Sequence, residues 1–292
     1  MNCNRKQKGG FKVKKFILIL VVLSTLIILA ACGGETEEQA EDSVWSQIEE
    51  SGEIVVGTAG TLYPASYYPE GSDELTGYNV EVFREIAERL GVDIKFETLG
   101  FDAMLSALQS GRVDIIQAGP REASRDKFAF SEPVKYSFAT MIVRADDLSG
   151  IHTLEDLKGK RAGGAATTVY SDIARKYGAE VVTYGNVTND AYLRDVHNGR
   201  TDVVINDYYL QSLAIQAFPE FNITLHPDLR FHPTTNNVVM QKDATVLLEK
   251  INEIIADMKE DGTLTKISEE FFGGLDVSKE PEEEVIEIEG IE

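Results

Sequence analysis

The sequence predicts an α/β fold with two lobes of similar topology. Strand-like and helix-like segments alternate along the interior of the chain, and two short motifs recur at nearly one offset. About 230 residues separate two polar, acidic stretches, which is enough for two ordinary α/β lobes. Two facing lobes leave a cleft between them, and ligand sites favour such interfaces.

The alternation is clearest in the first half of the chain. Strand segments there are short and rich in β-branched residues, whereas helical segments place apolar residues on one face. This order predicts parallel sheets covered by helices. The predicted elements are a strand at 53–57, a helix at 78–90, a strand at 92–97, a helix around Met104 and Leu108, and a strand at 113–116.

The second half repeats the scheme. Leu-Gly-Val-Asp-Ile at 90–94 is echoed by Tyr-Gly-Ala-Glu-Val at 177–181, an offset of 87 residues. Gly-Arg-Val-Asp-Ile-Ile at 111–116 is echoed by Gly-Arg-Thr-Asp-Val-Val at 199–204, an offset of 88. Short glycine-containing strings can match by chance, but two echoes at nearly one offset favour lobes of similar topology.

The C-terminal region contains helices and then an acidic end. A long amphipathic helix is stopped by Asp-Gly-Thr at 261–263, which begins a shorter helix. Residues 276–292 include Glu-Pro-Glu-Glu-Glu and predict a disordered acidic tail.

The first 31 residues predict a secretory signal. Six basic residues precede an apolar run at 16–29, which is shorter than the roughly 20 residues that a spanning helix needs. An uncleaved anchor is the alternative. Leu-Ala-Ala-Cys at 29–32 resembles a bacterial lipobox, which implies cleavage before Cys32 and a diacylglycerol on its sulfur. A diacyl anchor would hold the protein stably at a membrane.

The other cysteine and the charge agree with export. Cys3 would leave with the signal, so lipidation of Cys32 would explain a single remaining cysteine. Without residues 1–31 the chain has 22 basic and 49 acidic residues, a net charge of −27, which makes nucleic acid an unfavourable partner. Such a charge is typical of a solvated surface. Residues 32–44 are polar and acidic and predict a flexible lipidated linker.

No catalytic signature appears in the sequence. Four scattered histidines have no partner at ligand spacing, and the Gly-Gly at 163–164 lacks the further glycines and the lysine of a phosphate-binding loop. The pattern indicates a binding protein that needs no metal or cofactor.

Three segments are candidates for the cleft. The first is a loop at 57–67 with aromatic rings, among them Tyr63. In the second, Phe101 precedes a helix that we expect Asp102 to cap, although Phe101 could instead be a core residue. In the third, Thr167 and Thr168 stand at a helix start, where one can cap while the other faces a carboxylate.

Two charged residues could complete a site. Asp207 follows a strand at 201–206, and Arg125 lies in a loop after the strand at 113–116. Both strand ends are carboxyl ends, where open α/β sheets place ligands. A carboxylate and a guanidinium there would suit an α-ammonium and an α-carboxylate. Each residue alone is more often a surface residue or a cap.

Motifs over residues 45–275 resemble the family 3 extracytoplasmic solute-binding proteins, the polar amino-acid receptors of ABC importers. The segments at 165–170 and 205–209 look most like the cystine-type branch. The motifs are Gly-Thr-x-Gly-Thr with Tyr-Pro at 57–64, Leu-Thr-Gly-Tyr-Asn-Val-Glu at 75–81, Phe-Asp-Ala-Met-Leu at 101–105, Leu-Gln-Ser-Gly-Arg-Val-Asp at 108–114, Phe-Ala-Phe-Ser-Glu-Pro at 128–133, Leu-Lys-Gly-Lys at 157–160, Asn-Gly-Arg-Thr-Asp at 198–202 and Lys-Glu-Asp-Gly-Thr-Leu at 259–264.

The resemblance implies a two-lobe fold of the periplasmic-binding-protein-like type II, with hinge strands near 138–144 and 236–241. The first lobe would be discontinuous, with residues 45–137 and 238–275, and the second lobe would comprise 138–237. By matching motif positions, the residues expected to flank the ligand side chain are Tyr63 and Phe101. The residues expected to hold its α-carboxylate are Arg125, Thr168, Thr167 and nearby amides, and Asp207 is expected to hold its α-ammonium.

One stretch departs from the family pattern. Residues 117–125 are about two residues shorter than the family's loop and lack its serine-like donors. Arg121 therefore competes with Arg125 for the carboxylate role, and ligand specificity could have diverged here.

The resemblance also implies a function. We expect a monomer, anchored by lipid to the outer face of the cell membrane, that is not an enzyme. It would capture cystine or another polar amino acid by hinge closure and deliver it to the permease and ATPase of an ABC importer. A sensor that signals ligand occupancy and a dehydratase on the same fold are the alternatives.

Overall fold

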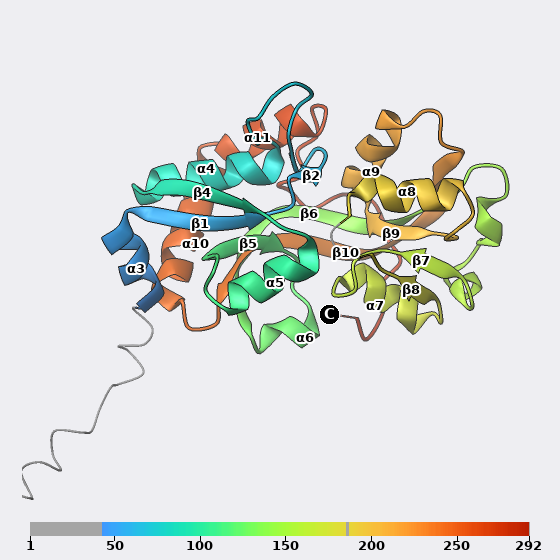
Figure 1. The fold of residues 1–292 in the computed structure, drawn as a ribbon, viewed down its shortest axis with the longest axis horizontal. Coiled ribbons are helices and arrows are strands. Elements are labelled where there is room, and N and C mark those ends of the chain that lie inside the picture. Colours follow the sequence, from blue (N-terminus) through green and yellow to red (C-terminus); the bar gives the residue numbers. More distant parts are fainter. Residues whose placement is uncertain (1–42, 185–186, 292) are drawn as a thin grey trace, which may run out of the picture. The chain divides into compact units, whose positions relative to one another are not determined.

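The computed structural model describes residues 43–184 and 187–291, and within them six strands form one mixed sheet (Figure 1). Their order is β4-β1-β5-β10-β6-β9. The expected signal at 1–31, Cys32 and nearly all of the expected linker lie outside the described residues. The α/β class is confirmed.

The described elements fall into two lobes joined by two long strands, β6 (Phe128–Arg144) and β10 (Ile223–Gln241). The first lobe contains α3 (Ser43–Ser51), β1 (Glu53–Thr58), β2 (Thr61–Leu62), β3 (Ser66–Tyr67), α4 (Tyr78–Leu90), β4 (Asp93–Thr98), α5 (Phe101–Gln109), β5 (Ile115–Ala118), α6 (Glu122–Arg125), α10 (Thr245–Glu260) and α11 (Thr263–Phe271). The second lobe contains 3-10 helices at Leu148–Gly150, Leu154–Leu157 and Ile215–Ala217, with β7 (Arg161–Gly163), α7 (Val169–Lys176), β8 (Glu180–Val182), α8 (Asn189–His197), β9 (Val204–Asp207) and α9 (Tyr208–Ala214).

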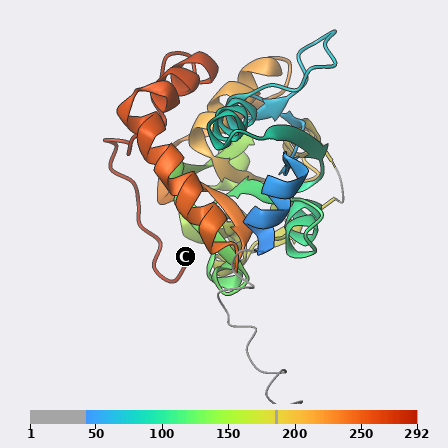
Figure 2. The same cartoon turned by 90° about the vertical axis from the view of Figure 1, so that its left-hand side faces the viewer.

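Apolar faces of the helices cover both faces of the sheet in each lobe. In the first lobe, α4, α10 and α11 bury one cluster against the sheet and α5 buries another on the opposite face. Figure 2 shows this layering, with α10 and α11 on the side away from α5. In the second lobe, α7 and the 3-10 helices at Leu148–Gly150 and Leu154–Leu157 pack on one face, while α8 and the 3-10 helix at Ile215–Ala217 pack on the other. The amphipathic periodicity therefore predicted the helical layers correctly, but the sheet is mixed and not parallel, because β10 runs antiparallel to β5 and β6 runs antiparallel to β9.

The recurring Gly-Arg-x-Asp motif has the same structural role in both lobes. Asp114 accepts a hydrogen bond from the Val55 amide at 2.7 Å, next to β5. Asp202 accepts one from the Arg161 amide at 2.8 Å, next to β9. Each carboxylate thus joins two parallel strands of its lobe, β1 to β5 and β7 to β9. The two echoes therefore mark equivalent positions of two similar topologies.

The paired strands β6 and β10 belong to both lobes. β10 pairs with β5 of the first lobe through residues 237–239, and β6 pairs with β9 of the second lobe through residues 139–142. Register shifts interrupt their own pairing between Phe231 and Pro233 and again from Asn236 onward. Irregularities of this kind bend strands, so the middle of the pair is a suitable place for a hinge.

The C-terminal segment, residues 276–291, packs against both lobes, so the expectation of a disordered tail is wrong for these residues. Val277 is 2% exposed in the first-lobe core, and Ile288 is 6% exposed in the second-lobe core. Between them, the Ile286 carbonyl accepts a hydrogen bond from the His232 amide at 2.7 Å. Figure 2 shows this dark red segment descending from α11 to the marked C-terminus. Burial of its isolated apolar residues needs surfaces that only the folded lobes supply.

Candidate functional site

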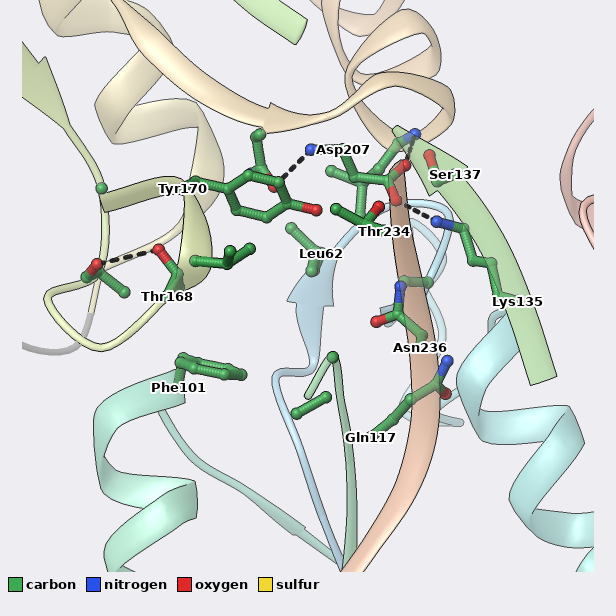
Figure 3. Close-up of a pocket in the computed structure, with 18 of the residues that line it drawn as sticks. Leu62, Phe101, Gln117, Lys135, Ser137, Thr168, Tyr170, Asp207, Thr234 and Asn236 are labelled. Carbon is green, nitrogen blue, oxygen red and sulfur yellow. Dashed lines mark hydrogen bonds and ion pairs between the residues drawn. The ribbon is translucent and has the colours of Figure 1, made fainter. Parts of the chain in front are cut away.

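A cleft of about 740 Å³ lies between the lobes, at the carboxyl ends of β1, β5, β7 and β9. Its walls come from loops of both lobes and from the middle of β6 and β10 (Figure 3). The C-terminal segment also contributes lining residues. Open α/β sheets place ligands at this edge, and the volume suits a small molecule.

The first lobe contributes an apolar wall and a tight loop. Leu62, the last residue of β2, and Phe101, the first residue of α5, both line the cleft. Gly119 lies in the loop after β5, where an added Cβ would come within 2.7 Å of the Thr235 carbonyl oxygen. A glycine is therefore needed for this loop to pass close to β10.

The second lobe directs the N-termini of two helices at the cleft. Thr168 caps α7 by accepting a hydrogen bond from the Ser171 amide at 3.2 Å. Asp207, the last residue of β9, caps α9 by accepting one from the Leu210 amide at 2.9 Å. The amides and dipole of a helix start favour anionic groups, and Asp207 already provides one at α9.

A buried ion pair crosses the floor of the cleft. The Lys135 Nζ atom, from β6, donates to the Oδ2 atom of Asp207, and both side chains are 6% exposed. Figure 3 shows the lysine reaching the carboxylate from the crossing strands. A buried charge without a partner is strongly unfavourable, so each group satisfies the other.

Gln117 adds a neutral polar group to the cleft wall. It lies in β5 and is 8% exposed. Among the described residues neither its Oε1 nor its Nε2 atom has a hydrogen-bond partner. Buried polar groups are seldom left unpaired, so this amide is a candidate for contact with a bound solute.

Two titratable groups of the cleft are held in neutral forms. Burial, followed by the nearby Asp207 carboxylate, raises the pKa of the Tyr170 hydroxyl well above its ordinary value. Burial lowers the pKa of His232 below its ordinary value of 6.5. Tyr170 therefore remains protonated and His232 uncharged near neutral pH.

Two polar contacts join the lobes across the cleft. The Asp102 carboxylate of α5 accepts hydrogen bonds from the Ala166 amide at 3.2 Å, from the Thr167 amide at 3.1 Å, and from the Thr167 hydroxyl. Arg121 forms a bidentate pair with Asp172 of α7. Both contacts need the lobes to be close together.

The structure brings most of the predicted site residues to the cleft. The residues that line it are Phe101, Arg125, Thr167, Thr168 and Asp207. Tyr63 is not among the lining residues; its side chain is 44% exposed and its ring meets Tyr67 edge-on.

Three local expectations need correction. Arg125 ends the short helix α6 instead of lying in a loop, and no described carboxylate is within ion-pair distance of it. Gly100, not Asp102, is the N-cap of α5, because the Asp102 carboxylate is directed at the second lobe. The donors of Thr167 are likewise engaged by Asp102.

Sequence reasoning missed Lys135 and Gln117. Both interrupt runs of otherwise uncharged or apolar strand residues, Lys135 in Val-Lys-Tyr-Ser-Phe-Ala and Gln117 in Ile-Ile-Gln-Ala. A polar side chain within a buried strand is a signal for a pocket, but the strand boundaries are needed before it can be read.

Neither a metal centre nor a membrane-spanning helix is found among the described residues. Among these residues, no group of three or more His, Cys, Asp or Glu side chains is placed to hold a metal ion. Within residues 43–184 and 187–291, no helix has the length and apolar character to cross a bilayer.

Comparisons with known proteins agree with this architecture. A family model described as bacterial extracellular solute-binding proteins, family 3, matches residues 54–274. The C-terminal segment lies beyond the match.

The chain is also similar to individual binding proteins over nearly its whole length. The chain is 52% identical to the probable ABC transporter extracellular-binding protein YckB of Bacillus subtilis, over 96% of this chain and 99% of the relative. It is 32% identical to the L-cystine-binding protein TcyA of the same organism, over 91% and 100%. A crystal structure of YckB matches 84% of this chain and 99% of its own, with a TM-score of 0.65 and 54% identity.

Proposed function

Because the chain belongs to the bacterial extracellular solute-binding proteins of family 3, we propose that it captures an amino acid in the cleft and delivers it to an ABC importer. The names of its relatives, an ABC transporter binding protein and an L-cystine-binding protein, support this role. The observation that carries the proposal is a cleft lined by charged and polar groups of both lobes. Such a site couples binding to closure, since a ligand that contacts both lobes favours the closed state.

The proposed contacts follow the placement of side chains. Phe101 provides an apolar surface for the ligand side chain, and Thr168 with the first amides of α7 provides donors for its carboxylate. Arg125, exposed at the edge of the cleft, is free to approach the same carboxylate. Arg121 is the weaker candidate because Asp172 already engages it. Asp207, which the sequence assigns to the α-ammonium, is already paired with Lys135. The protein acts as a binder and not as an enzyme.

Calorimetric titration with each proteinogenic L-amino acid and with L-cystine tests the proposal. We expect at least one of them to bind with about micromolar affinity or better. Mass spectrometry of the solute released from freshly purified protein gives an independent identification. If none of these compounds gave heat of binding and no amino acid co-purified with the protein, amino-acid capture would be refuted.

Attachment of the protein to the outer face of the cell membrane is a separate part of the proposal. It rests on the lipobox-like Leu-Ala-Ala-Cys at 29–32, with a diacylglycerol on Cys32. We expect Cys32→Ala to abolish palmitate labelling. The variant should either leave the membrane fraction or keep its uncleaved signal. Unchanged fractionation and labelling of that variant would contradict the anchor.

A further inference from the structure

Lys135 occupies the position at Asp207 that a ligand's ammonium group would take. One carboxylate oxygen of Asp207 accepts from the Leu210 amide at 2.9 Å, and the other accepts from Lys135. Neither side chain is more than 6% exposed, although both line the cleft. The protein therefore supplies its own cation to this carboxylate.

We infer that Lys135 is a specificity-determining residue, which makes binding in the cleft depend on an anionic group of the ligand and leaves the α-ammonium with a minor role. The inference rests on the proposed function, since it names the chemical class that the same cleft selects. That class is small carboxylates, with or without an amino group.

The reason lies in the charges at the floor of the cleft. A ligand ammonium that displaced Lys135 would leave a buried lysine without a partner, and one that shared Asp207 would place two cations at one carboxylate. Either unfavourable arrangement is relieved only when the ligand's own carboxylate accepts a hydrogen bond from Lys135. A carboxylate without an ammonium can accept from Lys135 while Asp207 keeps its hydrogen bond, so the ammonium adds little.

Groups around the pair agree with this assignment. Lys135 pairs with Asn236 in the β6–β10 register, so its neighbours on the crossing strands are neutral amide and hydroxyl groups (Figure 3). Its Nζ atom lies 5.7 Å from the centroid of the Phe272 ring, which is an uncharged neighbour. Of the other arginines in the cleft lining, Arg121 is already paired with Asp172, and Arg125 is exposed at the edge of the cleft and not at its floor. Lys135 is thus a cation at the cleft floor that can turn to an incoming anion.

Matched ligand pairs test the inference by calorimetry. The probes are L-glutamine with 4-carbamoylbutanoate, L-leucine with 4-methylpentanoate, and L-aspartate with succinate, each pair differing in the α-amino group. For any pair that binds, we expect the wild-type dissociation constants to agree within about fivefold. Lys135→Met should weaken the carboxylate-only member by more than about tenfold and shift the ratio within the pair towards the amino acid by at least about twentyfold.

Control variants separate charge from folding. Lys135→Arg keeps the cation and should retain the wild-type ratio, as should Lys95→Met, which removes an exposed lysine from β4. If Lys135→Met unfolds, the double variant Lys135→Met with Asp207→Asn removes both charges. It should still lose the carboxylate-only ligands.

The outcomes of these titrations distinguish the inference from the proposed function. Carboxylates that bind when no amino acid does would support the inference and refute amino-acid capture. Amino acids that bind more than about a hundredfold tighter than their partners, with Lys135→Met unchanged, would refute the inference and leave the proposed function standing. Binding of none of these probes would refute the inference, while the broader amino-acid titrations decide the proposed function separately.

Discussion

Arg121 of the first lobe and Asp172 of the second form a bidentate pair across the cleft, in which Nη2 and Oδ1 lie 2.8 Å apart. Their side chains are 21% and 26% exposed, so the pair is neither fully hydrated nor buried. Bidentate arginine–carboxylate contacts are among the stronger charged hydrogen bonds. The pair exists only while the lobes approach each other, and it therefore belongs to the energetics of closure.

Removal of this pair should weaken ligand binding through closure. We expect Arg121→Ala to lower affinity about three- to tenfold, because the closed state loses one of its interlobe contacts. Asp172→Ala should have the same effect, and the double variant should be no worse than either single one. Arg112→Ala is the control, since Arg112 pairs with Glu97 inside the first lobe. If Arg121 instead bound the ligand directly, Asp172→Ala would leave affinity intact.

Thr168 should contribute to stability as a helix cap even without ligand. Its hydroxyl accepts from the Ser171 amide at the start of α7, so Thr168→Ala should cost about 1 kcal/mol of unfolding free energy. Thr188 holds the N-cap position of α8 but makes no side-chain capping bond, which makes Thr188→Ala the matched control. Urea denaturation without added ligand measures both. Equal losses in the two variants would argue against the capping role.

The C-terminal segment should contribute to the second-lobe core. Ile288 is buried there, so Ile288→Ala should lower the unfolding free energy by about 2 kcal/mol or more. Ile286 lies in the same segment but is 46% exposed, and Ile286→Ala should cost clearly less. Thermal and urea unfolding compare the two variants. If the segment were detached in solution, neither substitution would change the unfolding free energy.

His232 should make stability depend on pH. Burial lowers its pKa in the folded state below 6.5, so the unfolded chain takes up the proton first as pH falls. Its stabilising contribution is therefore present above pH 6.5 and is lost as the pH falls through the lower folded value. His232→Asn, which tolerates the positive φ of 51° at this position, should reduce the loss of stability between about pH 7 and pH 5. The same pH slope in variant and wild type would contradict this assignment.

The local sequence pattern was sufficient for most of the fold. The helix predicted at 78–90 is α4, and the strand predicted at 53–57 is β1 with one more residue. Periodicity predicts such elements because it records which side of a segment is buried. The echoed motif was equally informative, since Asp114 and Asp202 each accept an amide hydrogen bond from a neighbouring strand.

The C-terminal segment shows where local pattern was insufficient. Its composition is dominated by glutamates, which is typical of disorder. Four apolar residues with buried or half-buried side chains nevertheless hold it against the lobes: Val277, Val285, Ile288 and Ile291. Whether so few apolar residues suffice depends on the surfaces that they meet, which composition does not describe.

The sequence by itself determined the α/β class, the repeated topology and the segments that meet at the cleft, because side-chain periodicity and motif spacing are properties of neighbouring residues. Only the tertiary structure decided how the charges pair. Lys135 and Asp207 are 72 positions apart, and Arg121 and Asp172 are 51 apart. An ion pair depends on ångström distances between such separate segments and on their burial, and neither quantity exists before the two lobes have been brought together.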